Sequence, residues 1–478
     1  MKKSSGVIGA VVILGVAYLG TTWYVGKEAQ TTIERVVTQA NGRLVKLLGP
    51  DLSGSGLKVE ITNYQRHFFS SDVTYTVHMK DEDDKPIDLK LQDRLQHGPF
   101  PLAALRSGDF RPMLAYSRAQ LLASPASQKW FDSQQGESPL IVETEVGFGG
   151  SGSSVWTFAP TELVEGNEKL SFSGGAINVN FSNDFNDNTA SGQFDALSLI
   201  NPERGQNLAL KNIKGNSQTT GSNNEVTTQS TATVDALTIG DATEGAVTIE
   251  KLSINLDSHQ KDKLLDGSLR YDFGRLMVGN IDLGSVSVGG KTRQLDVAAL
   301  AALATEYDAI QAKHGGAVDE ELILTAEEEA QLHKRGMAVL ASNPSLSIDP
   351  LVWKNDKGES RALLQIDFVS PANTQSQPTD VLLAEILKRV KLDFSVSRPM
   401  FLQAFAQAQG DTQQKQQMEM LGALIYDQYV ARFRDAGLVK VDGDAAAAKI
   451  LYEKDSVEVN GQLMPVSEFM QRAMSVLM

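Results

Sequence analysis

The hydrophobic and polar positions of this chain follow different patterns along its length, and the first pattern is an uninterrupted apolar run at residues 7–25. As a helix this run would span roughly 28 Å, close to the hydrocarbon thickness of a bilayer. Lys2 and Lys3 precede it, and a tryptophan and a tyrosine end it, as is typical of membrane-spanning helices. The pattern predicts a single-pass membrane anchor that follows a short cytoplasmic tail at residues 1–6.

The alternative for this run is a cleaved signal peptide, which needs small residues three and one positions before the cleavage site. Residues 17–19 do not meet this requirement, and residues 20–22 meet it only weakly. The two lysines favour a cytoplasmic amino terminus, which leaves the bulk of the chain on the other side of the membrane. The chain has no cysteine, which excludes a lipid-modified cysteine, disulfides and thiol catalysis.

From about residue 57 to residue 290 the pattern changes to the alternation of apolar and polar residues that strands show. Clusters of Gly, Asn, Ser and Asp separate these short runs. Helical spacing is limited to residues 102–122, and the polar residues 216–230 indicate a loop or an edge strand. Strands with one buried face build antiparallel sheets. The segment at residues 27–49 carries an apolar stripe that predicts an amphipathic helix, packed on the following domain or lying on the membrane surface.

From residue 295 the spacing is mainly helical, and a capping box at Thr325 and Glu328 marks the start of one helix. Residues 379–390 and 413–436 are also predicted to be helical. A hairpin is predicted at residues 346–369. The dipeptide Asn460-Gly461 lies between two alternating runs, which is the strongest short signal for a second hairpin.

These patterns predict an α+β fold: one transmembrane helix, then a large antiparallel β-rich body with a helical carboxy-terminal half. The expected divisions are a cytoplasmic tail at 1–6, the anchor at 7–25, a juxtamembrane amphipathic helix at 27–49, an antiparallel β-rich domain at 50–290, a mainly helical region at 291–437 with a hairpin at 346–369, and a carboxy-terminal hairpin segment at 438–478.

The charge of the chain narrows its range of partners. The 478 residues include 59 acidic and 44 basic residues, for a net charge of −15. Nucleic-acid binding is driven by basic patches, and the sequence contains none. We therefore expect no nucleic-acid partner.

Several motifs resemble chemical sites but lack the context that the chemistry needs. Residues 147–152 match the dinucleotide-binding glycine pattern, yet the following residues read as a strand rather than a helix. Residues 284–292 resemble a phosphate-binding loop with the wrong spacing, and residues 184–195 lack the glycine of a calcium loop. The six histidines show no metal-ligand spacing. The sequence predicts no cofactor, no metal and no catalytic residue, although a triad assembled from distant residues stays an alternative.

Two segments have the character of signatures. They are Asn63-Tyr64-Gln65-Arg66-His67-Phe68-Phe69-Ser70-Ser71 and His97-Gly98-Pro99-Phe100-Pro101-Leu102. In the first segment, Tyr64, Phe68 and Phe69 are interpreted as core anchors at a bend between strands or as a partner-facing aromatic patch. In the second segment, two prolines with fixed φ indicate a rigid turn, with a binding loop as the alternative. The candidate interaction residues are Tyr64, Arg66, Phe68, Phe69, His97, Gly98, Pro99, Phe100 and Pro101.

Together with residues 353–360 and the turn at Asn460-Gly461, these segments resemble the YdgA-like family of Gram-negative inner-membrane proteins. The likeness extends over nearly the whole chain. The family has glycine where His67 stands here, so a special turn at this point does not carry over. The family domain is of unknown function, so the resemblance implies no catalytic residue. It implies a bacterial inner-membrane protein whose body lies in the periplasm.

We expect a non-enzymatic, membrane-anchored scaffold or binding protein of the cell envelope, with a lipid or an envelope protein as its partner. A lipid-handling protein resembling the AsmA-like envelope proteins is the sharper form, and it requires an exposed apolar groove. The alternative is a periplasmic hydrolase whose pocket would gather His97, His67 and acidic groups. Gly6 and Ala10, small residues four apart on the anchor, and the carboxy-terminal helices predict a homodimer.

Overall fold

The computed structural model describes residues 41, 57–67, 70–80, 85–97, 100–201, 206–222, 224–240, 245–314, 324–372, 379–407, 412–453 and 455–477. The chain divides into two compact units. The first unit is Met1–Asn223 with Ala232–Gly240, and the second is Asn224–Thr231 with Asp241–Met478. The predicted anchor at 7–25 lies outside the described residues. None of the helices within the described ranges has both the length and the apolar character that a membrane span requires.

The first unit is built on an antiparallel sheet, in which each strand pairs with the next in the order β1-β2-β3-β4-β5-β6-β9-β10-β11. These strands are β1 (Lys58–Arg66), β2 (Ser70–Lys80), β3 (Pro86–His97), β4 (Ala115–Leu121), β5 (Leu140–Val146), β6 (Gly152–Phe158), β9 (Gly175–Phe181), β10 (Asn188–Asn201) and β11 (Gln206–Gly221). A hairpin of β7 (Thr161–Glu165) and β8 (Glu168–Phe172) pairs through β8 with β10. Two short helices, α3 (Leu102–Arg106) and α4 (Gln128–Ser133), connect strands.

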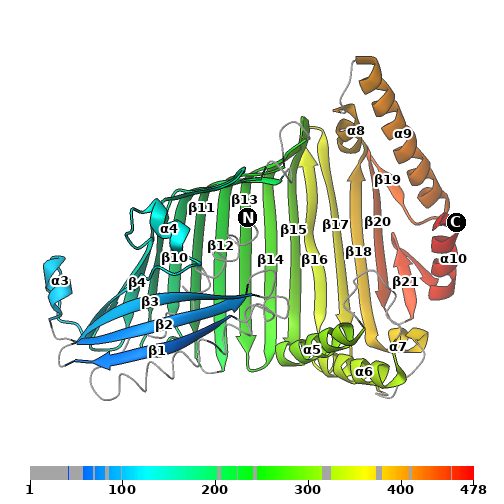
Figure 1. Ribbon diagram of the computed structural model, residues 1–478. Coiled ribbons are helices and arrows are strands. Elements are labelled where there is room, and N and C mark those ends of the chain that lie inside the picture. Colours follow the sequence, from blue (N-terminus) through cyan, green and yellow to red (C-terminus); the bar gives the residue numbers. More distant parts are fainter. Residues whose placement is uncertain are drawn as a thin grey trace. The chain divides into compact units, whose positions relative to one another are not determined.

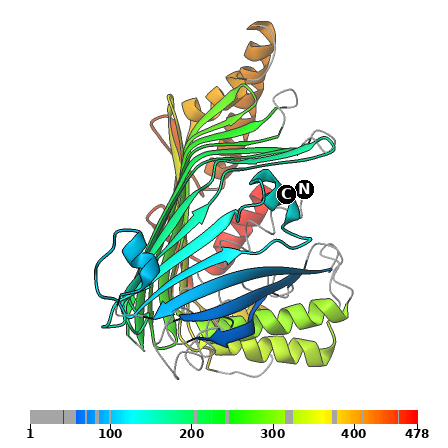
Figure 2. The ribbon, with the colours of Figure 1, turned by 60° about the vertical axis from the view of Figure 1, so that its left-hand side comes forward.

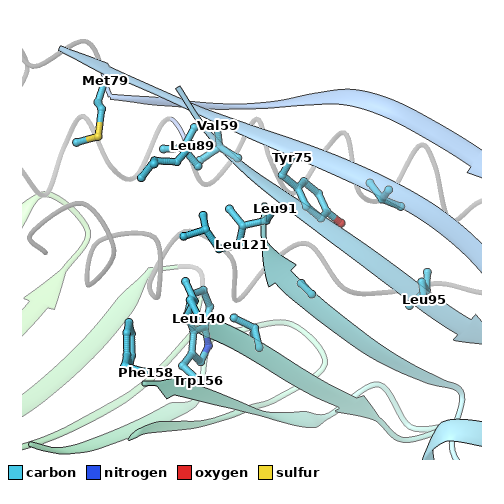
Figure 3. Packing of buried hydrophobic residues seen from close by; sticks show 14 of the residues in the cluster. Val59, Tyr75, Met79, Leu89, Leu91, Leu95, Leu121, Leu140, Trp156 and Phe158 are labelled. Carbon is cyan, nitrogen blue, oxygen red and sulfur yellow. The ribbon is translucent and has the colours of Figure 1, made fainter. Parts of the chain in front are cut away.

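Alternating side chains of β1 to β6 form the hydrophobic core of the first unit. Tyr75 of β2 lies opposite Leu91 of β3, which in turn lies opposite Leu121 of β4. All three are at most 2% exposed. Leu140 and Trp156, on β5 and β6, are fully buried in the same cluster. Figure 3 shows the side chains of β2 and β3 facing those of β5 and β6 across this core.

The side chain of Asn41 is hydrogen-bonded to the first strand of the first unit. Its side-chain nitrogen donates to the carbonyl of Val59, and its side-chain oxygen accepts from the amide of Val59, both at 2.9 Å. Val59 lies on β1, which pairs with β2 on its other side. The amide group of Asn41 therefore pairs with the outer edge of β1 in the way that a neighbouring strand would. The predicted juxtamembrane helix, apart from this helical residue, lies outside the described residues.

The second unit is built on a sheet of long antiparallel strands in the order β13-β14-β15-β16-β17-β18-β20-β21-β22, with β19 beside β20. The strands are β13 (Val247–Lys261), β14 (Leu264–Val278), β15 (Ile281–Asp296), β16 (Ser345–Asn355), β17 (Gly358–Phe368), β18 (Leu387–Ser397), β19 (Lys440–Asp442), β20 (Ala445–Glu453), β21 (Ser456–Val459) and β22 (Gln462–Pro465). One further strand, β12 (Glu225–Ile239), is divided between the two units.

The helices of the second unit lie at the ends of these strands and beside the last ones. They are α5 (Val297–Lys313), α6 (Ala326–Leu340), α7 (Thr379–Ile386), α8 (Arg398–Ala406), α9 (Thr412–Asp435) and α10 (Val466–Leu477). Figure 1 shows α5, α6 and α7 at one end of the strands and α8 with α9 at the other. In the rotated view of Figure 2, α5 and α6 form an antiparallel pair. The capping box of Thr325 and Glu328 is confirmed, because both of its hydrogen bonds are present.

The α+β class and the large antiparallel sheet are confirmed, whereas two local predictions are corrected. Residues 102–122 contain only the short helix α3 and then the strand β4, because alternate residues from Ala115 are buried. Of the two interpretations of residues 216–230, a loop or an edge strand, the structure has strand, because these residues belong largely to β11 and β12. The helix predicted at 379–390 ends at Ile386, where β18 begins and pairs on both sides.

The turn at Asn460 and Gly461 is confirmed as a hairpin of type I′, because both residues have positive φ, 53° and 88°. The side chain of Asn460 also makes hydrogen bonds outside the turn. Its side-chain oxygen accepts from the amide of Lys449 at 3.0 Å, and its side-chain nitrogen donates to the carbonyl of Leu438 at 3.2 Å. The turn is therefore bonded to β20 and to the residues that precede β19.

Candidate functional site

The described candidate residues from the first signature lie beside a small polar cluster in the first unit. The Tyr64 hydroxyl donates to Ser71 Oγ at 3.3 Å, and Ser71 Oγ lies 3.3 Å from Nε2 of His97. Tyr64 and Arg66 are on β1, and His97 is the last residue of β3. The structure therefore brings both signatures together at one end of β1 to β3. Four of the candidate residues, Phe68, Phe69, Gly98 and Pro99, lie outside the described residues.

The Ser71–His97 pair does not have the environment of a nucleophile and its base. Ser71 is completely buried, so a substrate could not reach its hydroxyl. Burial, and then the positive charge of Arg66, lower the pKa of His97. A carboxylate that orients a catalytic histidine would instead raise that pKa. His67 is exposed and pairs with Asp72 at 3.0 Å. Because Asp72 and Ser71 are adjacent on β2, their side chains lie on opposite faces of the sheet.

The burial of His97 predicts an acid-sensitive first unit. Because the pKa of His97 is lowered by folding, the unfolded chain binds the proton more readily. The contribution of neutral His97 to the free energy of unfolding should therefore be complete above about pH 6.5, and it should be lost as the pH falls below this ordinary histidine pKa. We expect the melting temperature to drop between about pH 7 and about pH 5.5, and to drop less in a His97→Gln variant. Parallel pH profiles of the two proteins would contradict this assignment.

The second signature lies next to an exposed apolar patch. Phe100 is 53% exposed and Leu102, at the start of α3, is 65% exposed. Two more exposed aromatic side chains, Phe110 and Phe148, lie near the same ends of β4 and β5, where Leu114 donates a backbone hydrogen bond to Val146. Pro101 itself is buried and precedes α3. The described residues of this segment thus end β3, begin α3 and expose two large apolar side chains.

The two glycine-rich motifs lie in a turn and in a strand, as their sequence context indicated. Residues 147–150 form the turn between β5 and β6, where Gly150 donates its amide hydrogen to the carbonyl of Gly147 at 2.9 Å. Residues 284–292 lie within β15, whose backbone pairs with β14 on one side and β16 on the other. A strand paired on both sides has no free row of amides to hold a phosphate.

A continuous apolar row crosses the sheet of the second unit. Residues that lie directly opposite one another on paired strands share a face of the sheet. From β13 to β21 this row is Leu256, Leu269, Gly290, Ile348, Leu364, Leu392, Ile450 and Val459. A second row on the same face begins with Ile254, Tyr271, Val288 and Leu351. Most of this face of the sheet is therefore apolar, with Ser258 and Thr292 as polar exceptions on either side of Gly267, and we call it the apolar face.

The opposite face of the same strands is polar. Its central row is Asp257, Ser268, Lys291, Ser347, Gln365 and Lys391. Lys291 makes a salt bridge of 2.6 Å to Asp349. Such a surface is stable in water, because its charges stay hydrated and are partly paired. This face needs no covering element.

Helices cover the apolar face at one side of the sheet and leave it open at the other. Over β18 and β20, α9 contributes Tyr426 and Val430 to a core cluster, and α10 contributes Val476 to another with β21 and β22. Val459, at the end of the first apolar row, is accordingly 1% exposed. Leu256 and Ile348 in the same row are 39% and 44% exposed. Within the residues that the structure describes, the apolar face from β13 to β17 is the uncovered part.

The open part of the apolar face contains a hollow of about 520 Å³. Its volume lies in the range of roughly 300–1,000 Å³ that small-molecule sites occupy. Almost all of the lining atoms are carbon, and the side chains that line it come from five strands. They include Leu256, Leu265, Leu269, Leu346, Ile348, Leu364 and Ile366. An open apolar hollow on a sheet is suited to a ligand that is itself apolar.

The chain was compared with known proteins. The model of the family described as "Bacterial protein of unknown function (DUF945)" matches residues 1–467. Protein YdgA of Escherichia coli K12 is 29% identical, with 98% of this chain and 96% of YdgA aligned. The uncharacterized protein YihF of the same organism is 24% identical over 99% of both chains. No solved structure matches the chain. The resemblance noted in the sequence is confirmed, and the chain belongs to the DUF945 family of bacterial proteins.

Proposed function

We propose that this protein is a non-enzymatic lipid-binding protein of the bacterial cell envelope. In this proposal residues 7–25 anchor it in the inner membrane, and the body lies in the periplasm, where the open apolar face holds acyl chains. The observation that carries the proposal is the contrast along one row of side chains, from 39% exposed at Leu256 to 1% at Val459. Contiguous apolar surface that stays exposed marks a binding surface for an apolar partner.

The chemistry of the face favours an acyl chain over an extended peptide as the ligand. The strands from β14 to β17 are paired on both sides, so their backbone offers no free edge for another strand. An extended peptide laid on this face would bury its own N–H and C=O groups without partners, which is costly. An acyl chain has no such groups along its length. It can cover the leucine and isoleucine side chains without leaving a polar group unpaired.

The hydrolase alternative has weaker support. A hydrolase would need one pocket that contains both His97 and His67. Ser71, the hydroxyl beside His97, is completely buried. His67 pairs instead with Asp72, whose side chain lies on the other face of β2 from Ser71. The homodimer predicted from the sequence stays a prediction, tested by crosslinking at native expression levels.

The proposal predicts that lipid binding depends on the apolar face and not on its reverse. The full chain, extracted in mild detergent, should carry co-purifying lipid in native mass spectrometry. A double variant, Leu269→Glu with Ile348→Glu, should lose this lipid by at least about tenfold, because a bound chain would bury unpaired carboxylates. Both side chains are more than a third exposed, so the variant should fold.

The matched control is Ser268→Glu with Ser347→Glu, which adds the same charges to adjacent residues on the opposite face. This control should keep the lipid at the wild-type level. Wild-type protein without bound lipid, or an equal loss of lipid in both double variants, would contradict the proposal.

A further inference from the structure

Two glycines lie next to each other in the floor of the hollow. Gly290 of β15 lies opposite Leu269 of β14 on one side and Ile348 of β16 on the other. Gly267 is the residue next to Leu269 on the same face of β14, and it lies opposite Thr292 of β15. Both glycines line the hollow. This face of the sheet therefore lacks a side chain at two diagonally neighbouring points, and Leu269 and Thr292 flank the diagonal between them.

Neither glycine is required by the backbone. Neither has φ in the left-handed region. A Cβ built on Gly290 would meet its nearest atom, the carbonyl oxygen of Ser347, at 3.8 Å, and a Cβ on Gly267 would meet that of Asp257 at 3.5 Å. These are ordinary contact distances. At the adjacent Gly289, by contrast, a Cβ would come within 2.9 Å of the Asp349 carbonyl, so glycine is needed there.

The irregular pairing near these glycines does not account for them either. The register of β15 against β16 shifts between Val288 and Gly290, and the extra residues there are Asp349 and Pro350 of β16. The register of β14 against β15 shifts beyond Gly267, where Gln294 of β15 has positive φ. Glycine inside a strand weakens it, and often marks a bulge or the close approach of a ligand or another backbone. Both glycines adjoin a register shift, but neither has the positive φ or the close backbone contact that would require glycine there, which leaves the close approach of a ligand.

We infer that the Gly267–Gly290 gap seats one unbranched acyl chain that crosses the strands obliquely. This inference rests on the proposed function and specifies its ligand. From β13 to β17 the open face spans four strand spacings, or about 19 Å. One leaflet of a bilayer has a hydrocarbon thickness of roughly 15 Å, half of the core, so an acyl chain of membrane length fits across these strands. A gap left by two missing side chains admits a polymethylene chain more readily than a branched chain.

The inference is tested by filling the gap in the full, detergent-extracted chain. Native mass spectrometry with added palmitate should show binding to the wild type and at least about tenfold weaker binding to Gly290→Leu. The melting temperature of Gly290→Leu should be equal or higher, because leucine favours the strand more than glycine does. Gly290→Ala should lose less binding than Gly290→Leu. Gly267→Leu is an independent second variant, with the same expected loss.

The control is Ser268→Leu, which adds the same side chain on the opposite face and should bind palmitate like the wild type. Phytanate, a branched chain, should bind the wild type several-fold more weakly than palmitate. The inference would be overturned if the wild type bound both acids equally. It would also be overturned if both leucine variants bound palmitate as tightly as the wild type does. If the leucine variants bind palmitate normally while Leu269→Glu with Ile348→Glu does not, the inferred position of the acyl chain is wrong but the proposed function stands. Wild-type protein that binds neither lipid nor palmitate would overturn both.

Discussion

Replacing Trp156 by alanine is expected to cost about 3–5 kcal/mol of folding free energy, the usual cost of a large-to-small change in a core. Trp156 is completely buried on β6 and belongs to the cluster of β1 to β6. Leu140, also completely buried, and Phe158 belong to the same cluster (Figure 3). The removed indole would leave a cavity that these neighbours cannot close fully, because their strands are fixed by pairing on both sides. The first unit should therefore unfold at much lower denaturant concentration.

The matched control for this change is Val155→Ala on the same strand. Val155 is 37% exposed and lies on the opposite face from Trp156. Its truncation should cost less than about 1 kcal/mol, as exposed positions generally do. Denaturant unfolding followed by circular dichroism would measure both changes. Equal shifts of the two midpoints would mean that Trp156 is not a core residue of this unit.

Deleting residues 457–478 is expected to unfold the carboxy-terminal end of the second unit. The deletion removes most of the β21–β22 hairpin and all of α10, which bury Val457, Val459, Met464 and Val476 in one cluster. Full burial of such side chains is worth roughly 1.5–3 kcal/mol each, so the combined loss approaches the roughly 5–15 kcal/mol by which whole domains are stable. The deletion would also remove the pairing of β21 with the end of β20, from Ile450 to Tyr452.

A pair of point variants separates loss of packing from loss of chain length. Val476→Asp places a charge in the cluster and should lower the melting temperature strongly, whereas Met474→Asp, on an exposed side of α10, should have little effect. Limited proteolysis of the deletion protein should release fragments from α9 and β20. An unchanged melting curve after the deletion would show that the hairpin is an appendage.

Local features of this fold were predictable where one short segment contains the whole signal. The alternation at residues 73–77 and 177–181 matches β2 and β9, and Asn460 with Gly461 defines its turn. The sequence left residues 216–230 open between a loop and an edge strand, because a strand made of Ser, Thr and Asn has no apolar alternation and only its pairing partners make it a strand. The helix α10 was missed, although Val466, Phe469, Ala473 and Val476 have helical spacing along it.

The open apolar face was not predictable, because its residues are distant in the sequence. Leu256 and Ile450 share one row only through the register of six successive strand pairs, and register cannot be read from composition. The alternation of Ser253-Ile254-Asn255-Leu256 did indicate a buried side for β13. It could not indicate that helices cover this side at β20 and leave it open at β13. The Ser71–His97 contact likewise depends on the pairing of β2 with β3.

The central claim is that acyl chains bind the open apolar face between β13 and β17. The most direct measurement is photo-crosslinking of the full chain with a diazirine analogue of palmitate, followed by mapping of the labelled residues by mass spectrometry. We predict labels on Leu269, Ile348 and the other side chains of the apolar face, with none on Asp257 or Gln365 on the reverse. Labels confined to other parts of the chain, or spread equally over both faces of these strands, would contradict the account.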